Sequence, residues 1–274
     1  MKLMKKKKSE NKKRDKLLLE TSVQIGKFIP DPKGSILKKL PSDSDLYSSY
    51  FCLYEFKVGL IRNLIEFYYL VKLYDKPSDA IGFWSKKFGK RELKNKIILE
   101  SLMAELYKSI NTQDTEEYLR QVEGVIFWLV SNFDTELRGM VGDFGSDSIV
   151  KFELYSSEYY QIYLDHYNKR KCIPLGNFWK KHSRELSLLI KNKDQFDKSK
   201  VLQGLYEKLN EISKDYDNSN KTQVNKSIGD AVIAVDCPSS MKVTTLDKSF
   251  KTICPIKGFC RNNTSFLMVF RSFL

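Results

Sequence analysis

The chain has few residues of the kinds that build zinc sites and structural disulfides. Its 274 residues include five cysteines and only two histidines. No Cys-x-x-Cys pair occurs, and His166 and His182 do not complete a zinc-binding pattern. The cysteines are scattered and odd in number: Cys52, Cys172, Cys237, Cys254 and Cys260. We therefore expect reduced thiols and a cytoplasmic protein, because structural disulfides belong to oxidising compartments.

Long apolar runs are absent as well. No stretch reaches the ~18 or more apolar residues that a transmembrane helix needs. The basic N-terminal stretch is followed by Leu17-Leu18-Leu19, which is too short for a signal peptide. The sequence therefore predicts neither a membrane helix nor a secretion signal, and we expect no membrane partner.

Positive charge, by contrast, is plentiful. Lys and Arg total 47 against 34 Asp and Glu, which gives a formal net charge of +13. Such an excess favours polyanionic partners such as RNA or DNA. Residues 1–16 hold eight lysines and one arginine. We expect this arm to be disordered, and it either binds phosphates or serves as a solubilising tail.

The pattern of apolar residues predicts an α/β fold. Leu17-Leu18-Leu19 is short, apolar and bounded by charge, which is typical of a buried strand in a parallel sheet. Residues 41–45 are expected to form a loop that leads into a long helix from Tyr50, because apolar residues then recur every three or four positions. Residues 71–220 show mainly helical periodicity. Further strands are expected over residues 242–245, 252–256 and 266–270.

Four short stretches each carry an acid beside apolar or β-rich residues. In chain order they read Leu-Leu-Glu20-Thr21-Ser22-Val, Tyr-Phe-Cys-Leu-Tyr-Glu55-Phe, Gly-Asp230-Ala-Val-Ile-Ala and Thr-Thr-Leu-Asp247-Lys-Ser-Phe. Glu20 and Asp247 each follow an expected strand, and ligands of open α/β sheets bind at the carboxyl ends of the strands. Glu55 lies near the edge of the buried face of the long helix.

Together these stretches resemble the four acidic motifs of PIN-domain ribonucleases, a family that includes the toxins of many toxin–antitoxin pairs. The resemblance implies a three-layer α/β/α core with a central parallel sheet, whose acids meet at the carboxyl edge and bind Mg²⁺ or Mn²⁺. It covers roughly residues 17–70 and 225–257, and we expect residues 17–70 and 221–274 to form a discontinuous PIN-like core. Residues 71–220 would be a mostly helical insertion. The first motif departs from the family because it carries Glu20 where Asp is usual.

The resemblance also implies roles for individual residues. Glu20, Asp230 and Asp247 would bind the metal, and Glu55 would orient water as an outer member of the catalytic group. Thr21 or Ser22 would bind a phosphate or a metal-bound water. Such a cluster suits divalent-metal-dependent hydrolysis, because the cation lowers the pKa of bound water and neutralises charge that develops on the phosphate. The implied activity is that of an endoribonuclease acting on RNA.

Simpler roles for the same residues stay open at this point. The fold could carry a non-catalytic module that binds nucleic acid or protein. Glu20 and Glu55 could be solvated residues, Asp230 could complete a capping box with Ser227, and Asp247 could cap a turn. An antitoxin-like inhibitor and a homodimer are further partners to consider. A stripe of tyrosines could stack bases or pack a helix: Tyr155, Tyr159, Tyr160, Tyr163 and Tyr167.

Overall fold

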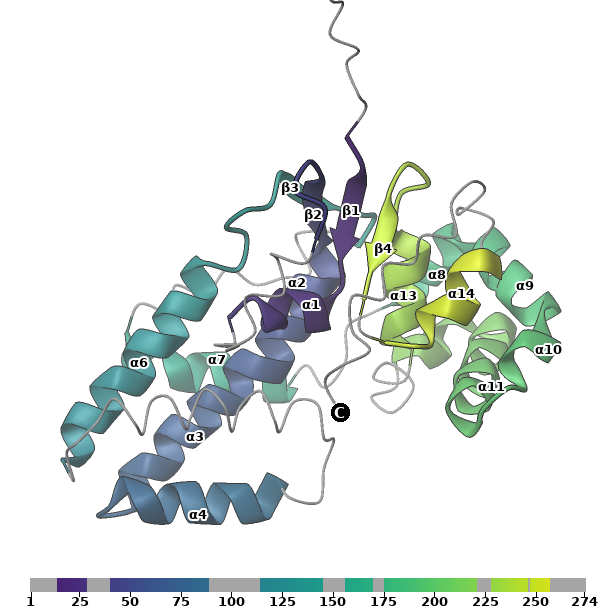
Figure 1. Cartoon of the computed structure of the whole chain (residues 1–274). Helices are drawn as coiled ribbons and strands as arrows, with labels where there is room; N and C mark the ends of the chain where they lie inside the picture. Colours follow the sequence, from purple (N-terminus) through teal and green to yellow (C-terminus); the bar gives the residue numbers. More distant parts are fainter. Residues whose placement is uncertain are drawn as a thin grey trace, which may run out of the picture.

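Four parallel strands form a central sheet with helices packed around it in the computed structural model (Figure 1). The structure describes residues 14–28, 40–88, 114–144, 156–169, 175–220, 228–245 and 247–256. The strands are β1 (Lys16–Leu19), β2 (Asp45–Ser49), β3 (Gly139–Val141) and β4 (Lys242–Thr244). Their order in the sheet is β3-β2-β1-β4. The expected α/β class, with a central parallel sheet in an α/β/α arrangement, is confirmed.

The sheet grows from β1 in two directions. On one side Leu18 pairs with Tyr47 of β2, and on the other it pairs with Val243 of β4. All three leucines of β1 are buried, as expected for a strand covered on both faces. The chain continues from β1 to β2 and β3, and it returns to the opposite side of β1 only with β4. The order of strands therefore reverses between β1 and β4.

Helices account for most of the remaining described residues. They are α1 (Thr21–Gly26), α2 (Tyr50–Phe56), the π-helix η2 (Lys57–Ile61), α3 (Arg62–Leu73), α4 (Pro77–Phe88), α6 (Thr115–Ser131), the 3₁₀ turn η4 (Ser157–Tyr159), α7 (Tyr160–Lys169), α8 (Gly176–Lys181), α9 (Ser183–Lys191), α10 (Lys193–Phe196), α11 (Lys200–Lys214), the 3₁₀ turn η5 (Tyr216–Asn220), α13 (Gly229–Asp236) and α14 (Phe250–Ile256). In Figure 1, β1 and β4 lie between the α1, α2 and α3 group and the α13 and α14 group.

The long helix expected from Tyr50 is present but contains a π-helical turn. The Ser49 hydroxyl caps its start by accepting a hydrogen bond from the Cys52 amide, at 3.1 Å. Five residues of π-helix, η2, then separate α2 from α3. The hydroxyl of Tyr163 on α7 donates to the Lys57 carbonyl at 2.8 Å, so the π-helical segment is held from outside. π-Helical turns of this kind occur often at functional sites.

The region 71–220 is mostly helical, but it is not separate from the sheet. β3 comes from this region and pairs in parallel with β2, as Ser48 with Met140. The expected core of 17–70 and 221–274 therefore shares its sheet with residues 139–141 of the expected insertion. Three residues are too few to show an alternating pattern, so the sequence gives no sign of this strand. Residues 89–113, which belong to the region with helical periodicity, lie outside the described residues.

Two further segments differ from expectation. The sequence predicts a loop up to residue 45 and a helix from residue 50, but residues 45–49 form β2. Ser48 and Ser49 can be buried in this strand because their hydroxyl groups find hydrogen-bond partners nearby. The Ser48 hydroxyl donates to the Leu19 carbonyl at 3.1 Å, and the Ser49 hydroxyl caps α2. Residues 252–256 form helix α14, not an edge strand, since the Ser249 carbonyl accepts the amides of Thr252 and Ile253. The candidate strand 266–270 lies outside the described residues.

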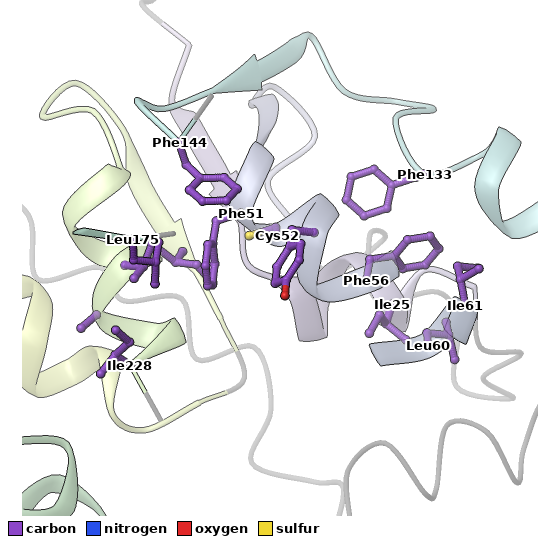
Figure 2. Packing of buried hydrophobic residues seen from close by; sticks show 14 of the residues in the cluster. Ile25, Phe51, Cys52, Phe56, Leu60, Ile61, Phe133, Phe144, Leu175 and Ile228 are labelled. Atoms are coloured by element: carbon purple, nitrogen blue, oxygen red, sulfur yellow. The ribbon is translucent and has the colours of Figure 1, made fainter. Parts of the chain in front are cut away.

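The core continues from the sheet into both groups of helices. Figure 2 shows Phe144, Phe51 and Leu175 in one part of it, and Phe133, Phe56 and Ile61 in another. α2 contributes to both parts, so its packing fixes the helix that carries Glu55. Among the described residues, no helix is long and apolar enough to cross a membrane.

Candidate active site

The candidate site lies at the carboxyl edge of the sheet, where the strand order reverses. Glu20 directly follows β1, and its amide donates to the Thr244 carbonyl of β4 at 3.0 Å. Thr245 directly follows β4. The crevice beside such a reversal is where open α/β sheets bind ligands. Glu20 and Thr245 are thus carried to this edge of the sheet by the neighbouring strands β1 and β4.

Glu20 is buried at the start of α1, with only 6% of its surface exposed. Its Oε2 accepts hydrogen bonds from the hydroxyls of Ser22 and Thr245, the latter at 3.2 Å. A buried carboxylate needs such donors, because the loss of hydration is otherwise costly. Ser22 on α1 and Thr245 just after β4 therefore orient Glu20.

Glu55 reaches the same edge from α2 and is half-buried. The Thr21 hydroxyl donates to its Oε2 at 2.5 Å. Burial chiefly raises the pKa of Glu55 to about 8, and the nearby charges of Glu20 and Asp230 raise it further against the effect of the Thr21 hydrogen bond. Glu55 therefore lies within the electrostatic influence of two of the other three acids.

The backbone of Gly229 lies beside Glu55. A Cβ added to Gly229 would clash with Glu55 Oε1 and would lie 3.4 Å from Cε1 of Phe51. Gly229 is the first residue of α13, and Asp230 is the second. The absence of a side chain at position 229 thus lets α2 and α13 bring Glu55 and Asp230 to one place.

Asp230 and Asp247 share one hydroxyl group. Ser249 Oγ lies within hydrogen-bonding distance of Asp230 Oδ2 and 3.0 Å from Asp247 Oδ1. The Ser249 amide also donates to Asp247 Oδ1, and the Asp247 amide donates to the Thr245 hydroxyl at 2.9 Å. A serine hydroxyl has one proton and can donate to only one of the two carboxylates at a time.

The sequence leaves open a capping role for Asp230 at the start of a helix and for Asp247 at a turn, and the structure differs between the two. Asp230 lies in the first turn of α13, but the N-cap is Ile228, which has no side chain that can cap, and the Asp230 carboxylate meets Ser249 instead. Ser227 lies outside the described residues. Asp247 does cap a turn, because it accepts the Ser249 amide. This role is compatible with its place beside Asp230.

The structure thus brings all four acids together from distant parts of the chain. Thr21 and Ser22 connect Glu55 and Glu20 through adjacent residues of α1, Thr245 connects Glu20 to Asp247, and Ser249 connects Asp247 to Asp230. Sequence reasoning missed Thr245, Ser249 and Gly229 as site residues. All three stand within two positions of a predicted acid, so proximity in sequence was the available signal.

The donor set suits a hard divalent cation. It consists of carboxylate and hydroxyl oxygens, which Mg²⁺ and Mn²⁺ prefer. Burial is the main cause of the raised pKa of Glu55, and the charges of Glu20 and Asp230 add a smaller part that a cation would offset. Within the described ranges, no three Asp, Glu, His or Cys side chains are already arranged around one ion position. Binding would therefore require the carboxylates to move closer to one common ion position.

The other candidates from the sequence have structural roles. His182 packs on the Phe178 ring at 4.5 Å and its Nε2 lies 3.3 Å from Asp143 Oδ2. Tyr160 and Tyr163 are buried on α7, as expected for a helix-packing face. The chain matches no protein-family model, no curated protein and no solved structure. The functional assignment therefore depends on the four acidic stretches and on the arrangement that the fold gives them.

Proposed function

We propose that the protein is a divalent-metal-dependent endoribonuclease of the PIN type. One observation carries the proposal: four acids from four separate stretches lie near one another at the reversal of strand order, where hydroxyl groups of neighbouring residues contact their carboxylates. The charge of the whole chain, +13, is in keeping with an RNA substrate, although the acids themselves are negative. A bound cation reconciles the two, because it neutralises the acids and the phosphate together.

Each acid has a distinct task in this proposal. Asp230 and Asp247, set side by side by Ser249, would hold Mg²⁺ or Mn²⁺ together with Glu20. A bound cation would lower the pKa of a water molecule and offset negative charge on the phosphate. Glu55, oriented by the Thr21 hydroxyl, would align the attacking water and take up its proton. Ser22 and Thr245 would keep Glu20 in place.

The decisive experiment measures cleavage of single-stranded RNA, with matched DNA beside it, in Mg²⁺, in Mn²⁺ and in EDTA. We expect metal-dependent RNA cleavage by the wild type and none by Asp230→Asn, which keeps the side chain's size but removes its charge. The matched control is Asp194→Asn, on exposed helix α10. Equal residual cleavage in the Asp230 and Asp194 variants would contradict the proposal.

A second candidate function is a non-catalytic module that binds RNA. The observation that favours it is the set of hydroxyl groups that already satisfies the acids, together with the extra methylene of Glu20 relative to Asp. The comparison of wild type with Glu20→Asp separates the two. RNA binding by fluorescence anisotropy without cleavage in either protein would support the module, whereas higher cleavage in Glu20→Asp would show an attenuated enzyme.

A further inference from the structure

The turn that follows β3 joins three elements that are far apart in the sequence. It consists of Gly142, Asp143 and Phe144. Gly142 has a φ of +108°, which L side chains rarely adopt, and a Cβ there would collide with the carboxylate of Asp236. Both the backbone angle and the lack of space therefore require glycine. We call these three residues the β3 turn.

The first element that the β3 turn holds is α13. Asp236 is the last residue of this helix and is 5% exposed. A negative charge at this end of a helix is disfavoured by the helix dipole. Asp236 Oδ1 nevertheless accepts the amides of Asp143 and of Phe144, the latter at 3.3 Å. The turn thus fixes one end of the helix whose other end presents Gly229 and Asp230.

The second element is α2. The Phe144 ring packs edge-on against Phe51, with centroids 5.2 Å apart, and lies 6.3 Å from Tyr54 (Figure 2). Phe51 is the residue that approaches Gly229, and Tyr54 is the neighbour of Glu55. Phe144 therefore supports the face of α2 that meets α13 beside the acids.

The third element is the junction of α8 and α9. The side chain of Asp143 pairs with Lys181 Nζ at 2.8 Å and with His182 Nε2 at 3.3 Å. The hydrogen bond from Lys181 lowers the pKa of Asp143. The same residue thus ties its backbone to α13 and its side chain to the helices of the 71–220 region.

We infer that the β3 turn positions the active site: it sets α13 against α2, and thereby sets Asp230 and Gly229 against Glu55. Through Asp143 it also makes the placement of α8 and α9 part of that geometry. Phe144 and Asp236 are positioning residues in this scheme, since both act on the acids through the helices they hold. The consequence for catalysis rests on the proposed function, whereas the placement of α13 does not.

The test compares two phenylalanines that differ in which part of α2 they support. Phe144 and Phe133 are both 3% exposed and flank β3 on its two sides. Phe133 packs on Phe56 at 4.8 Å, away from Gly229. Because the two rings are equally buried, Phe144→Leu and Phe133→Leu should lose similar stability in urea denaturation. Only Phe144→Leu should shift the backbone amide resonances of Gly229 and Asp230 in NMR spectra.

A second variant keeps the inference testable if Phe144→Leu does not fold. Asp143→Asn changes an exposed side chain, retains the backbone amides that bind Asp236, and weakens the pairs with Lys181 and His182. We expect smaller shifts at Gly229 in the same direction as those of Phe144→Leu. Unchanged Gly229 and Asp230 resonances in both folded variants, or equal shifts in Phe133→Leu, would overturn the inference.

Calorimetric titration with Mn²⁺ provides the link to function. Substitution of residues that hold metal ligands in place typically lowers metal affinity by about 10–100-fold. We therefore expect Phe144→Leu to bind Mn²⁺ about tenfold more weakly than the wild type, and Phe133→Leu to bind it as tightly as the wild type. If the wild type neither binds Mn²⁺ nor cleaves RNA, the proposed function fails, and the NMR comparison still decides the placement of α13. If it binds Mn²⁺ and both variants bind equally well, the positioning role fails alone.

Discussion

The carboxylate of Glu55 lies against the backbone of Gly229, so closely that position 229 has no room for a Cβ. This contact joins α2 to α13 at the point where Glu55 and Asp230 approach each other. The atom in the way is the end of a flexible side chain, whereas the Phe51 ring is at an ordinary distance. A side chain at position 229 would therefore displace Glu55 more readily than it would separate the helices.

Gly229→Ala should separate activity from stability. The added methyl group should push Glu55 away from the network and lower RNA cleavage by about a hundredfold, a loss typical of small misplacements of catalytic groups. Stability should stay equal or rise, because alanine favours a helix by ~1 kcal/mol over glycine. Urea denaturation and initial cleavage rates measure the two effects. Gly124→Ala is the control, since Gly124 lies within α6 with nothing near its Cβ position; a similar loss of cleavage there would contradict the mechanism.

Ser249→Ala should weaken metal binding, because the hydroxyl that sets the spacing of Asp230 and Asp247 is lost. We expect about tenfold lower Mn²⁺ affinity by calorimetry, in line with other residues that orient metal ligands. Ser249→Thr retains the hydroxyl and should recover most of the affinity. Ser213→Ala removes an exposed hydroxyl bonded to the Asn210 carbonyl and should have no effect. Undiminished Mn²⁺ affinity in Ser249→Ala would contradict the proposal that the shared hydroxyl sets the spacing of Asp230 and Asp247.

The stability of the metal-free protein should fall as pH rises from about 4.5 to about 8. The pKa of Glu55 is raised from 4.5 to about 8 on folding, chiefly by burial. Within this window the folded protein holds a proton that the unfolded chain has released, so each increase in pH favours unfolding. Melting temperatures across this range, without divalent cations, measure the effect.

Glu55→Gln is the matched variant for the pH experiment. It cannot ionise, so its stability should depend less on pH than that of the wild type between pH 4.5 and 8. Adding Mn²⁺ should reduce the decline in the wild type, because a cation favours the ionised acids. Identical pH profiles for the wild type and Glu55→Gln would refute the assignment of this proton to Glu55.

Tyr163→Phe should destabilise the fold by about 1 kcal/mol, because the Lys57 carbonyl loses the buried hydrogen bond from Tyr163 while keeping the one from the Arg62 amide. The loss should appear in urea denaturation with an unchanged slope. Tyr159→Phe provides the comparison, since Tyr159 is 42% exposed in the turn just before the same helix. If the two variants lose equal stability, the hydroxyl of Tyr163 does not support the π-helical segment.

The sequence predicts the strong patterns of this fold and misses the weak ones. Leu17 to Leu19 and the periodic helix after Tyr50 are unmistakable, because burial on a strand or on one helix face needs a regular series of apolar residues. β2 is hidden by Ser48 and Ser49, which are buried only because hydroxyl partners exist in the folded chain. β3 is too short to show a pattern, and α14 contains β-branched residues whose preference is overridden by packing.

The candidate site likewise combines residues that sequence patterns reveal with residues whose role is visible only in the folded chain. The acids can be selected from the sequence because their motifs keep a fixed order, and the strand before Glu20 indicates an edge of the sheet. Thr245 looks like an ordinary strand residue and Ser249 like an ordinary loop residue until the fold brings them to the acids. The need for Gly229 is likewise invisible until α2 and α13 meet. Contacts between distant segments, and not local preferences, determine these residues.

The pairing of β1 with β4 has a consequence for the order of folding. Glu20 and Thr245 meet across a separation of 225 residues. Contacts of such long range form late, because a large loop must close before they contribute any stability. During synthesis, Glu20 and Glu55 leave the ribosome long before Asp230 and Asp247 are made. A nascent chain therefore carries only half of the acids, and the candidate site is incomplete until β4 pairs with β1.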